Sequence, residues 1–106
     1  MFLYSLIRAN ERINCYTGMM KELEKSLKAC ANRRRLEILK FLKKKGRASV
    51  GEISDAIRLS FKSTSRHLVI LYAVDIVEKE QKSHQVYYWL STNQVGVIRN
   101  IIGHLQ

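Results

Sequence analysis

The chain has 106 residues, and its 19 Lys and Arg against 9 Asp and Glu give a formal net charge of +10. This length predicts one small domain, and no apolar run is long enough to span a membrane. The charge favours a polyanionic partner, nucleic acid before a membrane surface; the alternative is a basic surface kept for solubility. The apolar start, Met1–Ile7, is too short for a signal peptide, and neither cysteine belongs to a CxxC pair. Together these features predict a protein of the reducing cytoplasm.

Two helices are predicted in the first third of the chain. Residues 2–14 carry apolar residues at roughly helical spacing, and the Thr17-Gly18 pair interrupts this pattern. A second helix is predicted from about Met19 to Cys30. Its apolar stripe consists of Met20, Leu23, Leu27 and Cys30.

The next helix is predicted from Arg33 to about Lys44. Asn32 is a suitable N-cap, and the lysine run before Gly46 lies at the helix end where positive charge is favourable. The core side of this helix is formed by Leu36, Leu39, Phe41 and Leu42.

A short helix, a turn and a longer helix follow. Ser49 and Glu52 have the spacing of a capping box at the start of the short helix, which ends at Leu59. Ser60 caps the longer helix, which runs from Phe61 to about Ala73. The inward positions of the two helices are Val50, Ile53, Ile57, Thr64, Leu68 and Leu71. The opposite face of the longer helix carries Lys62, Arg66 and Val69.

A β-hairpin and a final helix complete the chain. Ile76 to Gln81 and Gln85 to Leu90 are predicted strands around a Lys82-Ser83-His84 loop, because the second run is β-branched and aromatic. A helix is then predicted from Thr92 or Asn93. Its apolar positions are Val95, Ile98, Ile101, Ile102 and Leu105.

This order of elements is that of a winged helix-turn-helix, a mainly α fold with a small β-hairpin. Three segments resemble the ArsR-type (arsenical-resistance-repressor-like) transcriptional regulators. LKACANRRRLEILKFL at residues 27–42 resembles the family's L-x-x-L-x-[DN]-x-x-R-L-x-I-L-x-x-L segment. LSFKSTSRHLVIL at residues 59–71 resembles its L-S-x-S-T-V-S-R-H-L-x-x-L recognition segment, and VYYWL at residues 86–90 resembles its wing strand V-x-Y-x-L. The likeness covers roughly residues 27–90.

The resemblance implies a DNA-binding homodimer, usually a repressor, that pairs through its first and last helices. On this basis residues 1–106 form one domain, in which 1–31 and 92–106 are dimerisation helices and 32–90 are the DNA-binding core. A two-fold dimer would bury both terminal stripes and hold two recognition helices about one DNA turn apart. We therefore expect a sequence-specific regulator that binds double-stranded DNA. The alternative is a winged helix used for protein–protein assembly or for sequence-neutral coating of DNA.

The chain departs from the family at its metal sites. The stretch from Arg47 to Ile53 matches the E-L-C-V-C-E-L segment of many members, but a hydroxyl and a glycine replace the two cysteines. The last helix offers only His104 toward the family's second site, which uses Asp, His and Glu. We therefore expect no metal and no other cofactor. Asp75 stands where the family usually has Gly, and Asp tolerates the left-handed conformation of such a turn.

The longer helix of the pair is expected to lie in the major groove with its first turns toward the bases. Lys62 and Arg66 project from its outer face, and an Arg side chain can fork onto O6 and N7 of guanine. Ser63 and Ser65 are short enough for close approach and can bind phosphate or base edges, while Val69 suits a thymine methyl group. The alternative is a basic, solvated helix.

Other basic residues are candidates for contacts with the DNA backbone. His67, near the inner side of the same helix, would either donate to a phosphate or fill a boundary position. The wing candidates would follow the DNA backbone or reach the minor groove, and the alternative is an exposed loop; they are Lys79, Lys82, His84 and Gln85. Arg33 and Arg34 begin a helix where positive charge is unfavourable, which predicts a phosphate contact. Arg35 matches a common arginine of the family and is predicted to be structural.

Cys15 and Cys30 leave three interpretations open. They are buried small hydrophobes, or a redox switch between dimer-forming helices, or part of a soft-metal site completed by a histidine and the partner subunit. The redox interpretation follows from the resemblance, since a few family members respond to oxidants or sulfur species. No supported Ser-His-Asp or Cys-His arrangement and no Gly-rich phosphate loop indicates catalysis, so we expect no enzyme.

Overall fold

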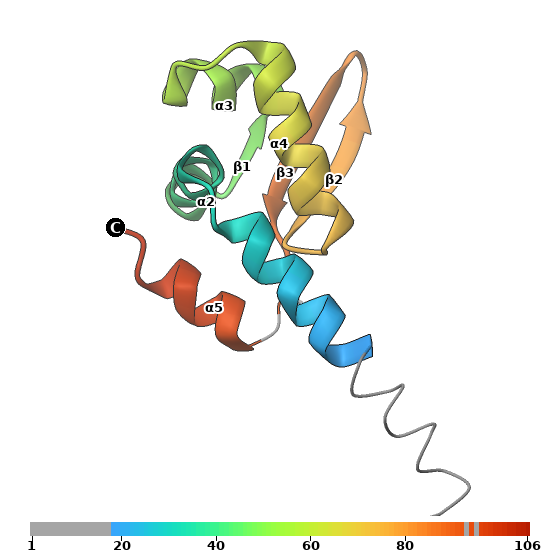
Figure 1. The fold of residues 1–106 in the computed structure, drawn as a ribbon. Coiled ribbons are helices and arrows are strands. Elements are labelled where there is room, and N and C mark those ends of the chain that lie inside the picture. Colours follow the sequence, from blue (N-terminus) through green and yellow to red (C-terminus); the bar gives the residue numbers. More distant parts are fainter. Residues whose placement is uncertain (1–17, 93, 95) are drawn as a thin grey trace, which may run out of the picture.

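The computed structural model describes residues 18–92, 94 and 96–106 (Figure 1). Its elements, in chain order, are a helix at residues 18–30, α2 (Arg33–Lys45), β1 (Arg47–Ser49), α3 (Val50–Ile57), α4 (Phe61–Ala73), β2 (Val77–Lys82), β3 (Gln85–Leu90) and α5 (Gly96–Gly103). This confirms the predicted winged helix-turn-helix order, mainly α with a small hairpin. The helix predicted over residues 2–14 lies outside the described residues.

Helix 18–30 includes a residue that the sequence pattern places in a break. Gly18 is already helical, so the predicted interruption is wrong at this residue, while Thr17 lies outside the described part. A glycine weakens a helix by about 1 kcal/mol relative to alanine but does not forbid it.

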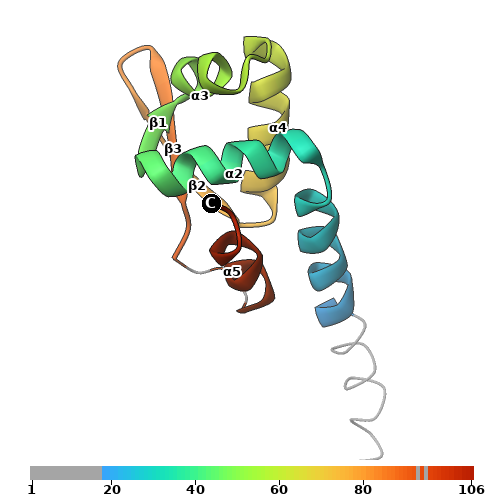
Figure 2. The same ribbon diagram turned by 90° about the vertical axis from the view of Figure 1, so that its left-hand side faces the viewer.

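The helices α2, α3 and α4 surround one core, and a small sheet closes its side (Figure 2). α4 packs on β2, and α2 packs on β3. Helix 18–30 extends from this body away from the sheet (Figure 1). The largest fully buried side chains include Ile38, Leu39, Leu42, Ile53, Leu68, Leu71 and Ile76. Residues from both helices of the helix-turn-helix therefore share one core with α2, which holds α4 in a defined position.

Side-chain caps determine where the helices begin. Asn32 Oδ1 accepts a hydrogen bond from the Arg35 backbone N–H at 3.2 Å. Ser49 Oγ accepts from the Glu52 N–H at 3.1 Å, and Glu52 Oε1 accepts from the Ser49 N–H at 3.0 Å, which is a complete capping box. Ser60 Oγ accepts from the N–H three residues later at 3.1 Å. The three predicted caps are confirmed.

The turn after α4 uses the left-handed conformation that the sequence allows. Asp75 has a φ of 60°. Its N–H donates to the Tyr72 carbonyl at 3.0 Å, and the Ile76 N–H donates to the Leu71 carbonyl at 3.1 Å. These are the paired bonds of a Schellman motif, which here forms without glycine and directs the chain into β2.

The sheet has one strand more than the predicted hairpin. β1 is short, and it pairs antiparallel with β3 through Arg47 opposite Trp89, Ala48 opposite Tyr88 and Ser49 opposite Tyr87. The strand order is β1-β3-β2. Three residues are too few to show a two-residue alternation, so β1 was not predicted.

The first strand of the hairpin is displaced by one residue from its predicted position, while β3 has the predicted bounds. β2 begins at Val77, opposite Leu90, and ends at Lys82, opposite Gln85. Lys82 is therefore a strand residue, contrary to its predicted place in the loop. The remaining two-residue turn is possible because Ser83 has a φ of 59°, which matches the twist of a tight hairpin.

Candidate nucleic-acid interface

The two faces of α4 differ as the sequence predicts. Thr64, Leu68 and Leu71 are buried. Lys62, Arg66 and Val69 are exposed, and Val69 keeps 53% of its surface. Ser63 and Ser65 are half-buried. Two cations, an aliphatic side chain and two small hydroxyls therefore share one surface, which is a composition suited to phosphates and base edges.

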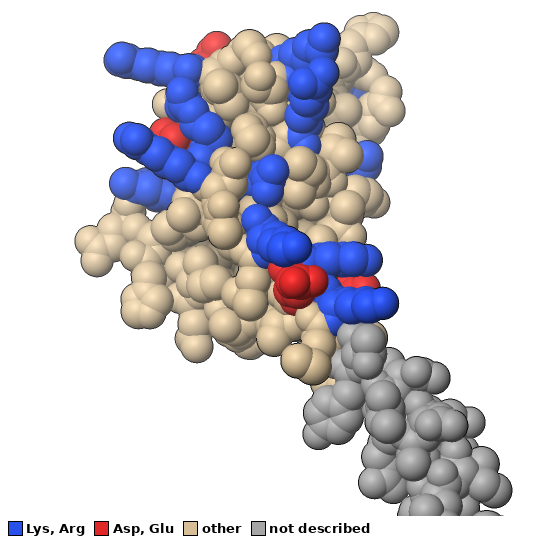
Figure 3. Space-filling view, in the orientation of Figure 1, with Lys and Arg blue, Asp and Glu red and all other residues tan. Residues whose placement is uncertain are grey.

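The N-terminal end of α4 carries a positive potential that favours a bound anion. The first turn contains no acidic residue, so no carboxylate of this turn offsets the positive end of the helix dipole. In Figure 3, which shows the side of the molecule that carries α4, Lys and Arg are spread over the face and Asp and Glu are few. A polyanion that approaches this side meets predominantly positive charge.

The inner side of α4 is tied to α2 and to helix 18–30 by Arg35. Its Nε donates to His67 Nδ1 at 3.1 Å, and its Nη1 donates to the carbonyls of Ala29 at 3.3 Å and Lys28 at 3.4 Å. The predicted structural role of Arg35 is confirmed. His67 is half-buried, which is compatible with both of its predicted roles. Burial, with the positive charges of Arg35 and Arg34, lowers the pKa of His67.

The two arginines before Arg35 have different surroundings. Arg34 Nη1 donates to the Ile57 carbonyl at 2.8 Å, and it lies 3.5 Å from Glu37 Oε1. Arg34 therefore satisfies a carbonyl at the end of α3, a role that the sequence analysis missed. Arg33 is exposed at the start of α2.

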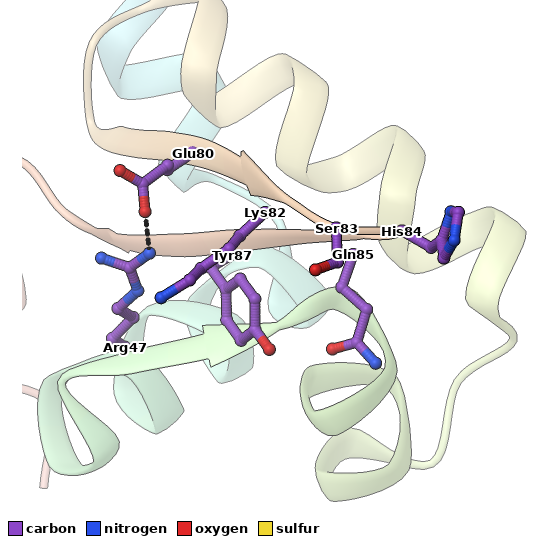
Figure 4. A pocket seen from close by; sticks show the side chains of 7 residues that line it. All are labelled: Arg47, Glu80, Lys82, Ser83, His84, Gln85 and Tyr87. Carbon is purple, nitrogen blue, oxygen red and sulfur yellow. Dashed lines mark hydrogen bonds and ion pairs between the residues drawn. The ribbon is translucent and has the colours of Figure 1, made fainter.

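The wing candidates do not form one group. Lys79 lies on the side of β2 that faces α4, where its Nζ is 4.5 Å from the centroid of the Tyr72 ring. Alternate residues of a strand face opposite sides, so Lys82 and its neighbour Gln85 lie on the other side. His84, at the hairpin tip, points away from these two residues (Figure 4). The four side chains therefore offer positive and polar groups on both sides of the wing.

A cluster around Arg47 supports the outer side of the wing. Arg47 pairs with Glu80 (Figure 4). Its guanidinium lies 4.8 Å from the Trp89 ring centroid and 5.2 Å from that of Tyr87. The hydrogen bond and charge of Arg47 lower the pKa of Glu80. Sequence analysis missed this cluster because it needs the β1–β3 pairing. The only signal was the alternation that places Tyr87 and Trp89 on one side of a strand.

Apolar side chains remain exposed on the helices at the two ends of the described chain. In helix 18–30 they are Met19, Met20, Leu23 and Leu27, and in α5 the exposed one is Val97. The carbonyls at the end of α5 are bound by Lys43, whose Nζ lies 2.6 Å from the Leu105 oxygen, 3.1 Å from that of Ile102 and 3.2 Å from that of Gly103. The sequence analysis placed this lysine only in the run at the end of α2, and the structure shows that it also anchors α5 to α2.

Cys30 is almost fully buried, as the hydrophobic interpretation predicts. Burial raises the pKa of its thiol, and the positive charge of Arg35 opposes this shift. Cys15 lies outside the described residues, so the interpretations that need both cysteines remain predictions. Within residues 18–92, 94 and 96–106, no group of three or more His, Cys, Asp or Glu side chains is placed to hold a metal ion.

The fold, together with the outer face of α4, defines a winged helix-turn-helix protein. Residues 32–79 match the family model of the bacterial regulatory proteins of the arsR family. The transcriptional activator HlyU of Vibrio cholerae is 34% identical over 93 residues, which cover 81% of this chain and 85% of HlyU. The arsenical resistance operon repressor of Bacillus subtilis is 30% identical over 78 residues, which cover 74% of each protein.

Solved structures agree with these sequence relationships. The homodimeric winged helix-turn-helix DNA-binding domain Mb0332 of Mycobacterium bovis superposes with a TM-score of 0.73 at 25% identity, over 83% of this chain and 81% of that domain. The chain belongs to the ArsR family, and it is a DNA-binding transcriptional regulator. Across the part of the chain that the structure describes, no helix combines the length and apolar character needed to cross a membrane.

Proposed function

We propose that the protein represses transcription by binding a two-fold symmetric operator in duplex DNA as a homodimer. The observation that carries this proposal is the outer face of α4, where Lys62, Arg66 and Val69 are exposed beside a first turn without acidic residues. Packing among the described residues does not explain these two cations, because both are exposed. They suit the major groove, where the helix would meet both phosphates and bases.

Six residues of α4 have proposed contacts. Arg66 forks onto O6 and N7 of a guanine, and Lys62 adds a second base or phosphate contact. Ser63 and Ser65 allow the helix backbone to come close, while Val69 touches a thymine methyl group. The Nδ1 of His67 accepts a hydrogen bond from Arg35, so a neutral His67 carries its proton on Nε2 and can donate it to a phosphate.

Backbone contacts would extend from this helix to the wing and to α2. The proposed wing contacts are Lys79, Lys82, His84 and Gln85. Arg33 is the better-supported of the two α2 candidates, because Arg34 already donates to the Ile57 carbonyl. Contacts on both sides of α4 would fix its register on the duplex, which sequence recognition by Arg66 needs.

The dimer would form through the helices at the two ends, with residues 1–31 and 92–106 in the interface and 32–90 as the DNA-binding core. Support comes from the exposed apolar residues of helix 18–30 and α5, and from the homodimeric Mycobacterium bovis relative. A two-fold axis would hold two copies of α4 roughly 34–36 Å apart, one turn of DNA. The protein would act in the cytoplasm, where chromosomal DNA is its ligand, and would catalyse no reaction.

The experiment is selection of a binding site from random duplexes, followed by fluorescence anisotropy with the selected site and a scrambled copy at several salt concentrations. We expect a preference of at least about 10³-fold. The logarithm of the binding constant should fall by about 0.9 per neutralised phosphate for each unit rise in log salt. Arg66→Ala should lose about 10- to 100-fold of this preference, because a bidentate guanine contact contributes about 1–3 kcal/mol.

The matched control is Lys40→Ala, which removes one exposed positive charge from α2 outside the proposed contacts. This variant should keep the preference of the wild type. Equal affinity for both duplexes would contradict the proposal and favour a protein that coats DNA without regard to sequence. Absence of binding at low salt would favour a protein–protein assembly module.

A further inference from the structure

We infer that Phe61 is a further specificity-determining residue, which contacts the C5 methyl group of one thymine in each half-site. The inference rests on the proposed function and deepens it, because it adds a residue that the contacts above do not include. Phe61 is the first residue of α4 and is 61% exposed. Among the described residues it is the most exposed large apolar side chain outside helix 18–30.

The fold does not account for this phenyl ring. The cap of α4 is made by Ser60, and the position after a cap accepts most residue types, polar ones included. Among the other exposed apolar side chains of α4, Tyr72 lies against Lys79, and Val69 already has a proposed DNA contact. The exposed residues of helix 18–30 and α5 belong to the proposed dimer surface. Phe61 belongs to neither set.

Phe61 lies at the N-terminal end of α4, the end that the proposed binding mode turns toward the bases. Phe61, Ser65 and Val69 follow one another at intervals of four residues and form one row along α4. Lys62 and Arg66 form the adjacent row. The first row thus has two apolar side chains with a small serine between them, and the adjacent row has two cations. With about 100° per residue, Phe61 and Tyr72 also lie on nearly the same side of the helix, the side toward Lys79 and the wing.

The chemistry of the major groove leaves one good partner for such a ring. The base edges there present hydrogen-bond donors and acceptors, and their one apolar group is the methyl of thymine. A phenyl ring cannot hydrogen-bond to a base edge, so it would favour thymine over cytosine through the methyl alone. Phe61 precedes Arg66 by about 7.5 Å along the helix axis and lies about 140° from it around that axis. The thymine should therefore belong to a different base pair from the guanine that Arg66 contacts.

The test replaces thymine with uracil, one position at a time, in the operator selected by the wild-type protein. Uracil keeps the base pair and removes only the methyl group. At the position that Phe61 contacts, we expect affinity to fall about fourfold for one half-site and about sixteenfold for both, from the usual contribution of a buried methyl group. Phe61→Ala should bind the thymine and uracil duplexes equally at this position. It should retain the wild-type response at other thymines.

Two variants sharpen the assignment. Val69→Ala, on the same row, should lose the response at a different thymine and keep the one assigned to Phe61. Phe61→Gln should change the selected base from thymine to adenine, since Gln binds adenine N6 and N7. This variant gives an answer even where the alanine variant folds poorly, because its readout is a gained preference.

Two results would overturn the inference, and they differ in what else they overturn. A Phe61→Ala protein that keeps the wild-type uracil penalty at every thymine refutes the role of Phe61. The selected operator and its dependence on Arg66 would then leave the proposed function intact. A wild-type protein that selects no sequence refutes the proposed function, and the role of Phe61 with it.

Discussion

The inner and outer faces of α4 differ in residue type and relate to the rest of the chain in opposite ways. On the inner face, Thr64 and Leu68 are inaccessible to solvent, and His67 is hydrogen-bonded to Arg35. On the outer face, Lys62 and Arg66 are exposed. Folding constrains the first set, whereas the second set is available to a partner. Substitutions on the two faces should therefore separate stability from DNA affinity.

The largest expected effect on stability is at Arg35. Arg35→Met keeps much of the aliphatic stem but removes the donors to His67 and to the carbonyls of Lys28 and Ala29. We expect the free energy of unfolding to fall by about 2–3 kcal/mol, because bonds from charged donors contribute about 1.5–3 kcal/mol and the acceptors lose their partner. Urea denaturation measures this change.

The matched variant on the outer face is Arg66→Met, which removes the same charge from an exposed site. Its unfolding free energy should stay within about 0.5 kcal/mol of the wild type. Equal losses in the two variants would mean that the two faces of α4 do not differ in their contribution to stability.

A smaller effect, of opposite sign, is expected at Thr64. The hydroxyl oxygen of this side chain is buried and has no hydrogen-bond partner among residues 18–92, 94 and 96–106. Thr64→Val keeps the shape and the β-branch but removes the unsatisfied group, so stability should rise by about 1 kcal/mol. Thermal or urea unfolding tests this, with Thr64→Ser as the control that keeps the hydroxyl and loses the methyl. Loss of stability in the valine variant would show that the hydroxyl has a partner after all.

The smallest effect is a pH dependence from His67, whose pKa is lowered from its ordinary value of 6.5 by burial and by Arg35 and Arg34. Between the folded and unfolded pKa values the unfolded chain binds more protons, so stability rises with pH in this window. The contribution of His67 to the free energy of unfolding should be fully present above about pH 6.5, and it should decline as the pH falls below this value. Urea unfolding between pH 5 and 8 should show this slope, and His67→Gln should remove it. A slope that persists in the variant would assign it to another group.

Much of the fold is encoded in local patterns that can be read directly from the sequence. The caps at Asn32, Ser49 and Ser60 are confirmed, because each depends on residues no more than three positions apart. The inward stripe of α4 is confirmed for the same reason: 3.6-residue periodicity reports burial within one element.

The contacts that the sequence analysis missed join segments that are far apart in the chain. Arg34 reaches the Ile57 carbonyl across 23 residues, and Lys43 reaches the end of α5 across 59 or more. Strand β1 exists only through its pairing with β3. No periodicity records such contacts, because side-chain reach and strand pairing are decided by the assembled fold. The assignment of Arg66 to a guanine and Phe61 to a thymine stays a prediction until DNA is present.

The pairing of β1 with β3 has a further consequence for how quickly and how tightly the wing could engage a duplex. β1 lies between α2 and α3, so the hairpin is attached at its base to the segment that leads into the helix-turn-helix. The direction of the wing is thus set when the chain folds, and its backbone entropy has already been lost before any DNA arrives. Little further conformational entropy would then be lost on binding. The helix and the wing would therefore contact the DNA as one rigid body.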